Sequence, residues 1–338
     1  AMGTTVSIAN AVGAGDRKRA AQSIGNTVTL FMSLSVVLMG LLLLSVRPIT
    51  AVMATPPQAV ASTVSYLTVC FLGIPFITAY NILASVFRGM GDSKSPMYFI
   101  AVACVCNIGL DFLFIGALGL GPVGAALGTT LSQTVSVALS LCVIVKKRSI
   151  GLSKSDFKPK KAVMRRLLSI GLPVAAQDGL IQIAFIVITV IANSRGLNTA
   201  AAVGIVEKII GFVFLVPSSL LSAVSALGAQ NIGAGKPQRA VRTLRDSIFL
   251  AVGFGIVCTV GVQFCAEGLV ALFTDETASG GTEVVRLGGQ YLRGYIFDCI
   301  FAGIHFCFSG YFCAMGKSVL SFVHNILAVV LVRIPGAY

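Results

Sequence analysis

Five charged residues stand inside long apolar runs of this sequence: Asp111, Asp178, Glu207, Lys208 and Asp298. An ionised group in hydrocarbon costs about 2.5–3.5 kcal/mol even on lenient insertion scales, so such groups are expected to face a cavity or a polar partner. Four of the five are acidic. An interior of this composition attracts cations, which suits either a coupling ion or a cationic substrate.

Asp298 and His305 have the most specific spacing. Asp298 lies near the middle of the apolar stretch RGYIFDCIFAGIHFCFSGYF, and His305 follows two helical turns later on roughly the same face. A carboxylate and an imidazole in this arrangement are suited to take up and pass a proton. The alternative is a buried, hydrogen-bonded pair that has no part in transport.

Asp178 has two amide neighbours, Gln177 and Gln182, shortly after Pro173. A proline inside a helix frees a backbone carbonyl, which can then serve as an oxygen ligand for an ion. We therefore expect this group of side chains to contact the coupling ion or the substrate.

Glu207 and Asp111 complete the set of candidates. Glu207 follows a short loop by about two turns, and the adjacent Lys208 points about 100° away around the helix, so it is not assumed to be its partner. Asp111 lies one turn from Asn107, and a hydrogen bond between them would satisfy both groups in a structural role. If the coupling ion is sodium, the sequence offers Asp178, Glu207 or Asp298 as its carboxylate. We expect no cofactor.

The elements that carry these residues are predicted to be membrane-spanning helices. The chain is 56% hydrophobic and 11% charged, whereas a soluble domain has about a quarter charged residues. Each apolar stretch is long enough to cross about 30 Å of hydrocarbon as a helix. The stretches lie at 26–46, 62–87, 96–118, 122–145, 167–194, 199–228, 245–272, 288–315 and 319–338, with a partial one at 1–12.

The net charge is +13, and most of the basic residues lie in the connections between the apolar stretches. Alternate connections hold 19 of the 25 Lys and Arg residues, while opposite connections such as GALGLGPVG (116–124) have almost none. Under the positive-inside rule the basic connections are cytoplasmic. The charge is therefore a topology signal, and we expect the partners to be the lipid bilayer and a small molecule, with no nucleic acid. The predicted location is a cell membrane, crossed many times, and specifically a bacterial inner membrane.

Two loop motifs occur twice in the same order. NAVGAGDRKRA (10–20) returns as QNIGAGKPQRA (230–240), and FRGMGDSKSP (87–96) returns as FCAMGKS (312–318). The nearly constant offset indicates an internal duplication. Because both copies of each loop are basic, the two halves are predicted to run in the same direction across the membrane.

The offsets also predict how the chain is organised. The second half has more sequence before its first motif, and the first half has more after its second motif, so restoring both deficits gives two bundles of six helices. The fold class is thus an all-α membrane protein with two parallel repeats, with twelve helices in the intact protein and about ten here. The predicted domains are an N-terminal lobe at 1–145, a cytoplasmic linker at 146–166 and a C-terminal lobe at 167–338.

The motifs FRGMGDSKSPM, NIGLDFLFIGALGLGPVGAALGTTLSQ (107–133) and QNIGAGKPQRA resemble those of the multidrug and toxic compound extrusion (MATE) transporters. The resemblance covers essentially the whole chain. It implies two six-helix lobes around a central cavity and export of cationic, amphipathic compounds coupled to sodium or proton influx. It assigns no coupling residue here, because the acidic residue of the family's first helix has no counterpart in this sequence.

Two other functions compete with an antiporter that works by alternating access as a monomer. A flippase for lipid-linked saccharides would favour a cationic cavity to hold pyrophosphate, whereas this interior is acidic. An integral membrane enzyme is disfavoured because the sequence contains no HExxH or GxSxG motif and has two histidines.

Overall fold

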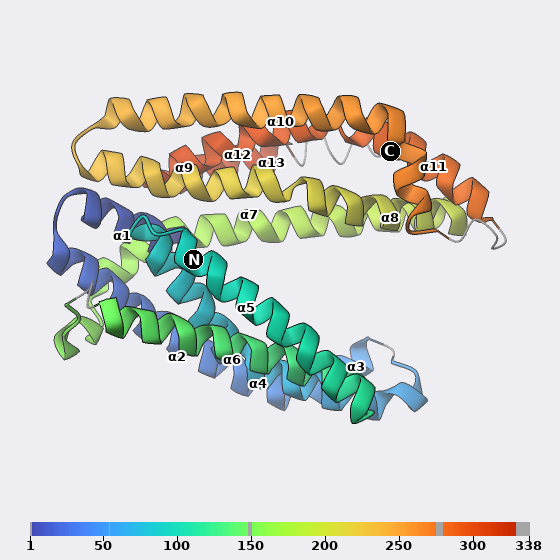
Figure 1. Ribbon diagram of the computed structural model, residues 1–338, viewed down its shortest axis with the longest axis horizontal. Helices are drawn as coiled ribbons and strands as arrows, with labels where there is room; N and C mark the ends of the chain where they lie inside the picture. Colours follow the sequence, from blue (N-terminus) through green and yellow to red (C-terminus); the bar gives the residue numbers. More distant parts are fainter. Residues whose placement is uncertain (1, 54, 148–150, 275–279, 329–338) are drawn as a thin grey trace. The chain divides into compact units, whose positions relative to one another are not determined.

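The computed structural model describes residues 2–53, 55–147, 151–274 and 280–328 (Figure 1). These residues form helices and the turns between them, without strands, which confirms the all-α fold class. The chain divides into two compact units, residues 3–167 and residues 168–338, here called unit 1 and unit 2. The predicted linker at 146–166 and C-terminal lobe at 167–338 each include residues outside the described ranges, namely 148–150, 275–279 and 329–338.

Unit 1 is built on four long helices. The helix α4 (Pro57–Gly89) packs against α2 (Arg17–Leu44) and α6 (Gly121–Lys147), and α6 also packs against α5 (Lys94–Asp111). The shorter elements are α1 (Met2–Gly13), α3 (Val46–Val52), a π-helical turn η1 (Phe112–Ala117) and a 3₁₀ turn η2 (Lys154–Phe157). Ile8, Ile24, Ile82 and Val86 form a core where α1, α2 and α4 meet.

Unit 2 centres on α10 (Pro237–Ala271) and α12 (Asp298–Ala314), which pack against each other and against α9 (Leu215–Gly233), as Figure 1 shows in yellow, orange and red. The helix α11 (Gly281–Tyr295) lies against α8 (Leu197–Val213) and α10. Unit 2 also contains most of α7 (Lys161–Ser194) and α13 (Ser318–Ala328). Its largest core includes Val206, Val270, Leu292 and Ile296.

The described helices have the length and the surface of membrane spans. Seven spans are long and apolar enough to cross a bilayer when α5 with η1 and α8 with α9 are each counted as one, and α11 with α12, bent by 43°, makes up to an eighth. Phe264 is 87% exposed and Leu197 is 85% exposed. In water, exposed apolar surface on this scale would be costly, but lipid chains accommodate it.

The duplicated motifs fold into the same turn four times. After α1, the N–H of Gly15 donates to Val12 O and that of Asp16 donates to Ala11 O; after α9, Gly235 and Lys236 repeat the pattern at the offset of 220. The turns after α4 and α12, at Gly91 and Gly316, have the same two bonds. Each is a Schellman motif, in which a residue of positive φ ends the helix, and all four glycines have φ between 70° and 88°. The sequence repeat is thus a repeat of backbone hydrogen bonds.

Three predicted helices are not continuous. The stretch 288–315 breaks between Tyr295 and Asp298, the stretch 199–228 has a break at Phe214, and the stretch 96–118 changes to the π-helical turn after Asp111. By contrast, α7 runs through Pro173 without interruption. The predicted linker also begins inside α6 and ends inside α7.

Candidate functional site

One group of buried polar residues in unit 2 lies where α7 and α13 are joined by hydrogen bonds. Gln177 is buried, and its Oε1 accepts a hydrogen bond of 2.7 Å from Ser321 Oγ. Asn325, one turn further on α13, donates to the Gln177 backbone oxygen at 3.4 Å. Ser321 also pairs with Ser309 of α12. One predicted site residue therefore lies in a polar network that joins three helices.

The two histidines of the chain meet at the edge of this network. His305 on α12 and His324 on α13 have their Nδ1 atoms 2.9 Å apart, with ring centroids 4.5 Å apart. One ring must donate and the other accept, so the neutral pair contains two different tautomers. The sequence predicts that His305 works with Asp298, whereas the structure brings the His305 ring against His324.

Asp178 and Gln182 lie on the exposed side of α7, in contrast to Gln177. The carboxylate of Asp178 interacts electrostatically with the buried thiol of Cys313 on α12. The three residues therefore do not form one group: Gln177 is buried in the network, whereas Asp178 and Gln182 are exposed.

Glu207 is half-buried on α8, as Asp111 and Asp298 are on their helices, whereas Asp178 is exposed. Thr189 of α7 lies beside it, with its own hydroxyl donating to the Phe185 backbone oxygen at 2.9 Å. Its Oε1 is buried without a hydrogen-bond partner in the part of the chain that the structure describes. Lys208 is exposed, as expected from its angle around the helix, and no salt bridge between described residues joins the two. Glu207 thus has an acceptor that a proton or a cation would satisfy.

Asp298 is the first residue of α12, not a mid-helix residue as its place in the sequence had suggested. A carboxylate in the first turn interacts favourably with the N-terminal end of the helix dipole. His305 lies seven residues along the same helix, a rise of about 10 Å. A proton relay between these two residues stays a prediction.

In unit 1, Asp111 and Asn107 form the predicted pair on α5, with Asn107 Nδ2 donating to Asp111 Oδ1 at 3.5 Å. The pair presses against Gly128 of α6, where an added Cβ would lie 2.2 Å from Asp111 Oδ1. The π-helical turn begins at the next residue, Phe112. A π-turn shifts backbone hydrogen bonds and is frequent at functional sites.

The candidate carboxylates do not converge on a metal site. Among the described residues, no three His, Cys, Asp or Glu side chains come close enough together to hold a metal ion. A sodium ion at Asp178, Glu207 or Asp298 would need oxygen ligands of other kinds, such as hydroxyl or backbone oxygens.

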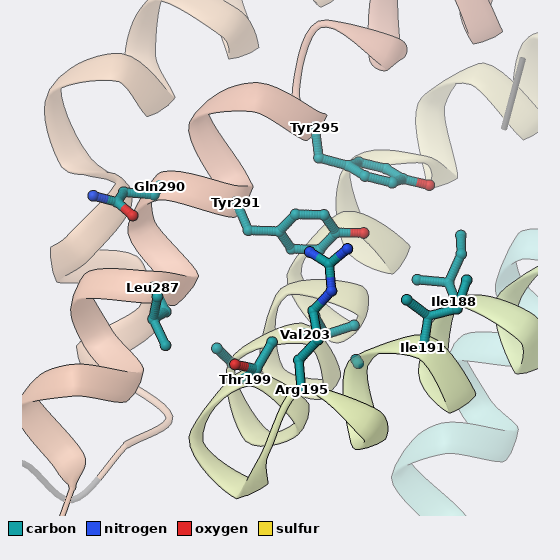
Figure 2. A pocket seen from close by; sticks show the side chains of 11 residues that line it. Ile188, Ile191, Arg195, Thr199, Val203, Leu287, Gln290, Tyr291 and Tyr295 are labelled. Carbon is teal, nitrogen blue, oxygen red and sulfur yellow. The ribbon is translucent and has the colours of Figure 1, made fainter. Parts of the chain in front are cut away.

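A cavity of about 460 Å³ opens in unit 2 between α7, α8 and α11 (Figure 2). This volume is in the range of small-molecule sites. Figure 2 shows Arg195, Tyr291 and Tyr295 converging on it, and the two tyrosine rings pack edge to face with centroids 5.6 Å apart. The sequence analysis did not select these residues, since tyrosines on a helix and an arginine in a loop carry no motif. The cavity is lined by Ile188, Ile191, Ala192, Arg195, Thr199, Ala202, Val203, Leu287, Gln290, Tyr291 and Tyr295.

Comparison with known proteins decides the family. A family model described as MatE matches residues 1–113 and 173–338, most of the chain. The chain belongs to the MatE family. This MatE protein is therefore a multi-pass membrane protein, and the resemblance seen in its loop motifs is confirmed.

Several relatives are named for drug resistance. The probable multidrug resistance protein YpnP of Bacillus subtilis (strain 168) is 29% identical over 83% of this MatE chain and 62% of the relative. YoeA of the same strain, also a probable multidrug resistance protein, is 28% identical over 99% and 73%. The multidrug export protein MepA of Staphylococcus aureus (strain N315) is 27% identical over 80% and 58%. The chain thus spans about three fifths of YpnP and MepA.

Solved structures share the fold. A MATE protein in complex with MaL6 aligns with a TM-score of 0.92 at 22% identity, over 98% of this chain and 74% of the other. An outward-facing multidrug resistance MATE transporter aligns with a TM-score of 0.91 at 22% identity, over 100% and 75%. At this identity the likeness concerns the architecture alone.

Proposed function

We propose that this protein exports small amphipathic compounds, cationic ones among them, in exchange for sodium ions or protons, by alternating access. The observation that carries the proposal is the match of residues 1–113 and 173–338 to the MatE model. It is supported by relatives named as multidrug resistance or export proteins. The proposal places the protein in a bacterial inner membrane. It also holds that the protein acts as a monomer and as a transporter, not as an enzyme.

An ion-coupled exporter needs a group whose occupancy favours one conformation over another. Glu207 suits this role, because its carboxylate lies within a membrane span and one of its oxygens has no partner among the described residues. A bound proton would let this oxygen donate, and a bound sodium ion would use it as a ligand. Either event would change the contact between the Glu207 carboxyl group on α8 and Thr189 on α7. Asp111, with Asn107, is the corresponding candidate in unit 1.

The test is efflux of a fluorescent organic cation from liposomes that contain the protein, under an imposed sodium gradient or pH gradient. We expect gradient-driven efflux from the wild type and a loss of at least about tenfold in Glu207→Gln. Lys208→Gln is the matched control, since it removes a charge from the adjacent, exposed position. Equal loss in both variants, or efflux that ignores both gradients, would contradict the proposal.

The same preparation separates transport from chemistry. A transporter moves an unchanged compound and needs a sealed vesicle, whereas an enzyme would convert its substrate in detergent solution. Recovery of the intact compound outside the vesicles supports export. Turnover to a new product without any gradient would point to catalysis instead.

A further inference from the structure

The segment that joins the two units is fixed to a helix of unit 1 over residues 152–160, here called the docked segment. The side chain of Asn26 on α2 makes three bonds to its backbone. Nδ2 donates to the oxygens of Asp156 at 3.1 Å and Lys158 at 3.3 Å, and Oδ1 accepts from the N–H of Lys160 at 2.7 Å. Asn26 is fully buried. One amide therefore satisfies both ends of a short irregular segment, which would otherwise leave these groups unpaired.

Contacts on either side of Asn26 hold the segment close to α2. Thr29 Oγ1 donates to the Phe157 oxygen at 2.8 Å. At Gly25, an added Cβ would lie 2.4 Å from the Asp156 oxygen, so the backbones of helix and segment touch. Leu152 packs against the core formed by α1, α2 and α4. The docked segment is thus part of the packed unit.

In the docked segment, the acidic side chain is buried and the basic side chains are exposed. Asp156 is buried, and its Oδ2 accepts from the Ser153 N–H at 2.9 Å in a capping box. The basic side chains point outward: Lys154, Lys158 and Lys160 of the segment are exposed, and so is the adjacent Lys161, the first residue of α7. No salt bridge to another described residue neutralises them. The outer surface of the segment is therefore cationic.

This surface lies at the level of the lipid headgroups. The charge-free part of α2 begins at Ala20 with the polar residues Gln22, Ser23, Asn26 and Thr27, and it becomes predominantly apolar only from Val28 to Leu44. These residues rise about 26 Å, close to the thickness of the hydrocarbon. Asn26 therefore marks the boundary on the basic, cytoplasmic side. The exposed ring of Phe157 on the same segment suits the interface, where aromatic side chains concentrate.

The basic turn of unit 2 differs in a way that provides a control. Arg242 and Arg245, which follow the turn between α9 and α10, both lie near Asp246, at 3.7 Å and 3.3 Å. Their charge is partly neutralised within the protein. Within the ranges that the structure describes, the lysines of the docked segment have no comparable acidic partner, and Asp156 is turned inward.

We propose that the docked segment is a binding site for the headgroup of an anionic phospholipid. The lysines supply the charge, and Asn26 holds them in the plane where phosphate groups lie. Several lysines near an anionic surface act together, so the preference over a zwitterionic lipid is expected to be about tenfold or more. The proposal concerns lipid binding and does not depend on which compound or ion the protein moves.

The experiment titrates the purified, delipidated protein with phosphatidylglycerol or phosphatidylcholine and counts bound lipids by native mass spectrometry. We expect tighter binding of phosphatidylglycerol by the wild type and loss of that preference in K154Q/K158Q/K160Q/K161Q. The control, K236Q/R239Q/R242Q/R245Q, removes four charges from the basic turn of unit 2 and should keep the preference. If both variants lost the preference for phosphatidylglycerol equally, net charge alone would explain the binding and the proposed site would be wrong. Wild-type binding of phosphatidylglycerol by the lysine variant would also contradict the proposal.

A second variant tests the docking itself. Asn26→Ala keeps every lysine but frees the segment, so we expect weaker phosphatidylglycerol binding together with tryptic cleavage after Lys154 or Lys160. If Asn26→Ala does not fold, Thr29→Val removes a single bond to the segment and serves in its place. A folded variant that is cleaved there and still binds phosphatidylglycerol like the wild type would show that docking is not needed.

Discussion

His305 and His324 contact each other across α12 and α13, with their Nδ1 atoms 2.9 Å apart. They are the two histidines of the chain. One turn away on each helix, Ser309 and Ser321 form a second contact, and Ser321 continues to Gln177 of α7. The interface between α12 and α13 therefore contains paired polar side chains. Their hydrogen bonds add to the van der Waals packing that otherwise holds helices together in a membrane.

This relationship predicts an energetic coupling. Replacing either histidine with alanine should lower the free energy of unfolding by about 1 kcal/mol, and the double variant should lose less than the sum, with a coupling of about 0.5–1.5 kcal/mol. The measurement is a double-mutant cycle from denaturant titrations in detergent. If the effects of the two substitutions on the free energy of unfolding were strictly additive, the contact would contribute nothing to stability.

Two glycines of α2 give opposite predictions for the same substitution. Gly25→Ala should cost about 1–3 kcal/mol, because its Cβ would meet the Asp156 backbone 2.4 Å away. Gly40→Ala should be neutral or stabilising by up to about 1 kcal/mol, since nothing lies within 4 Å of that position and alanine favours a helix. Thermal unfolding of the two variants in the same detergent checks this. A harmless Gly25→Ala would mean that the segment does not touch α2.

Gly128 and Asp111 give a prediction on function. Gly128→Ala places a methyl group 2.2 Å from Asp111 Oδ1 and 3.4 Å from Asn107 Nδ2, so the carboxylate must shift and its hydrogen bond to Asn107 is disturbed. If this pair helps to bind the coupling ion, the ion concentration for half-maximal efflux should rise several-fold. Gly109→Ala on α5, which has open space around it, is the control. An unchanged ion dependence in a well-folded Gly128→Ala protein would leave the pair with a structural role.

The direction of the two repeats can be read by labelling. Cysteines at Ser93 and Lys317, both exposed in the turns after α4 and α12, should react with a membrane-impermeant maleimide from the cytoplasmic side only. A cysteine at Ser194, at the end of α7, should react from the other side. A cysteine-free background is needed because nine native thiols are present. Labelling of the two turns from opposite faces would refute the parallel repeat.

The amino-acid sequence by itself determined the spans and the turns of this protein. Both depend on local properties: a run of apolar residues is long enough or it is not, and a glycine such as Gly91 or Gly316 ends a helix because it alone adopts a positive φ without strain. For the same reason the duplication could be read from two short motifs and then found again in identical hydrogen bonds.

Only the tertiary structure decided which polar groups meet. His305 contacts His324, Gln177 accepts a hydrogen bond from Ser321, and Asn26 bonds to a segment some 130 residues away in the sequence. Spacing along one helix gives the face of a side chain but not the rotation and depth of the neighbouring helix, which follow from packing over its whole length. The break before Asp298 is of the same kind: it places a carboxylate that reads as mid-helix at the start of α12.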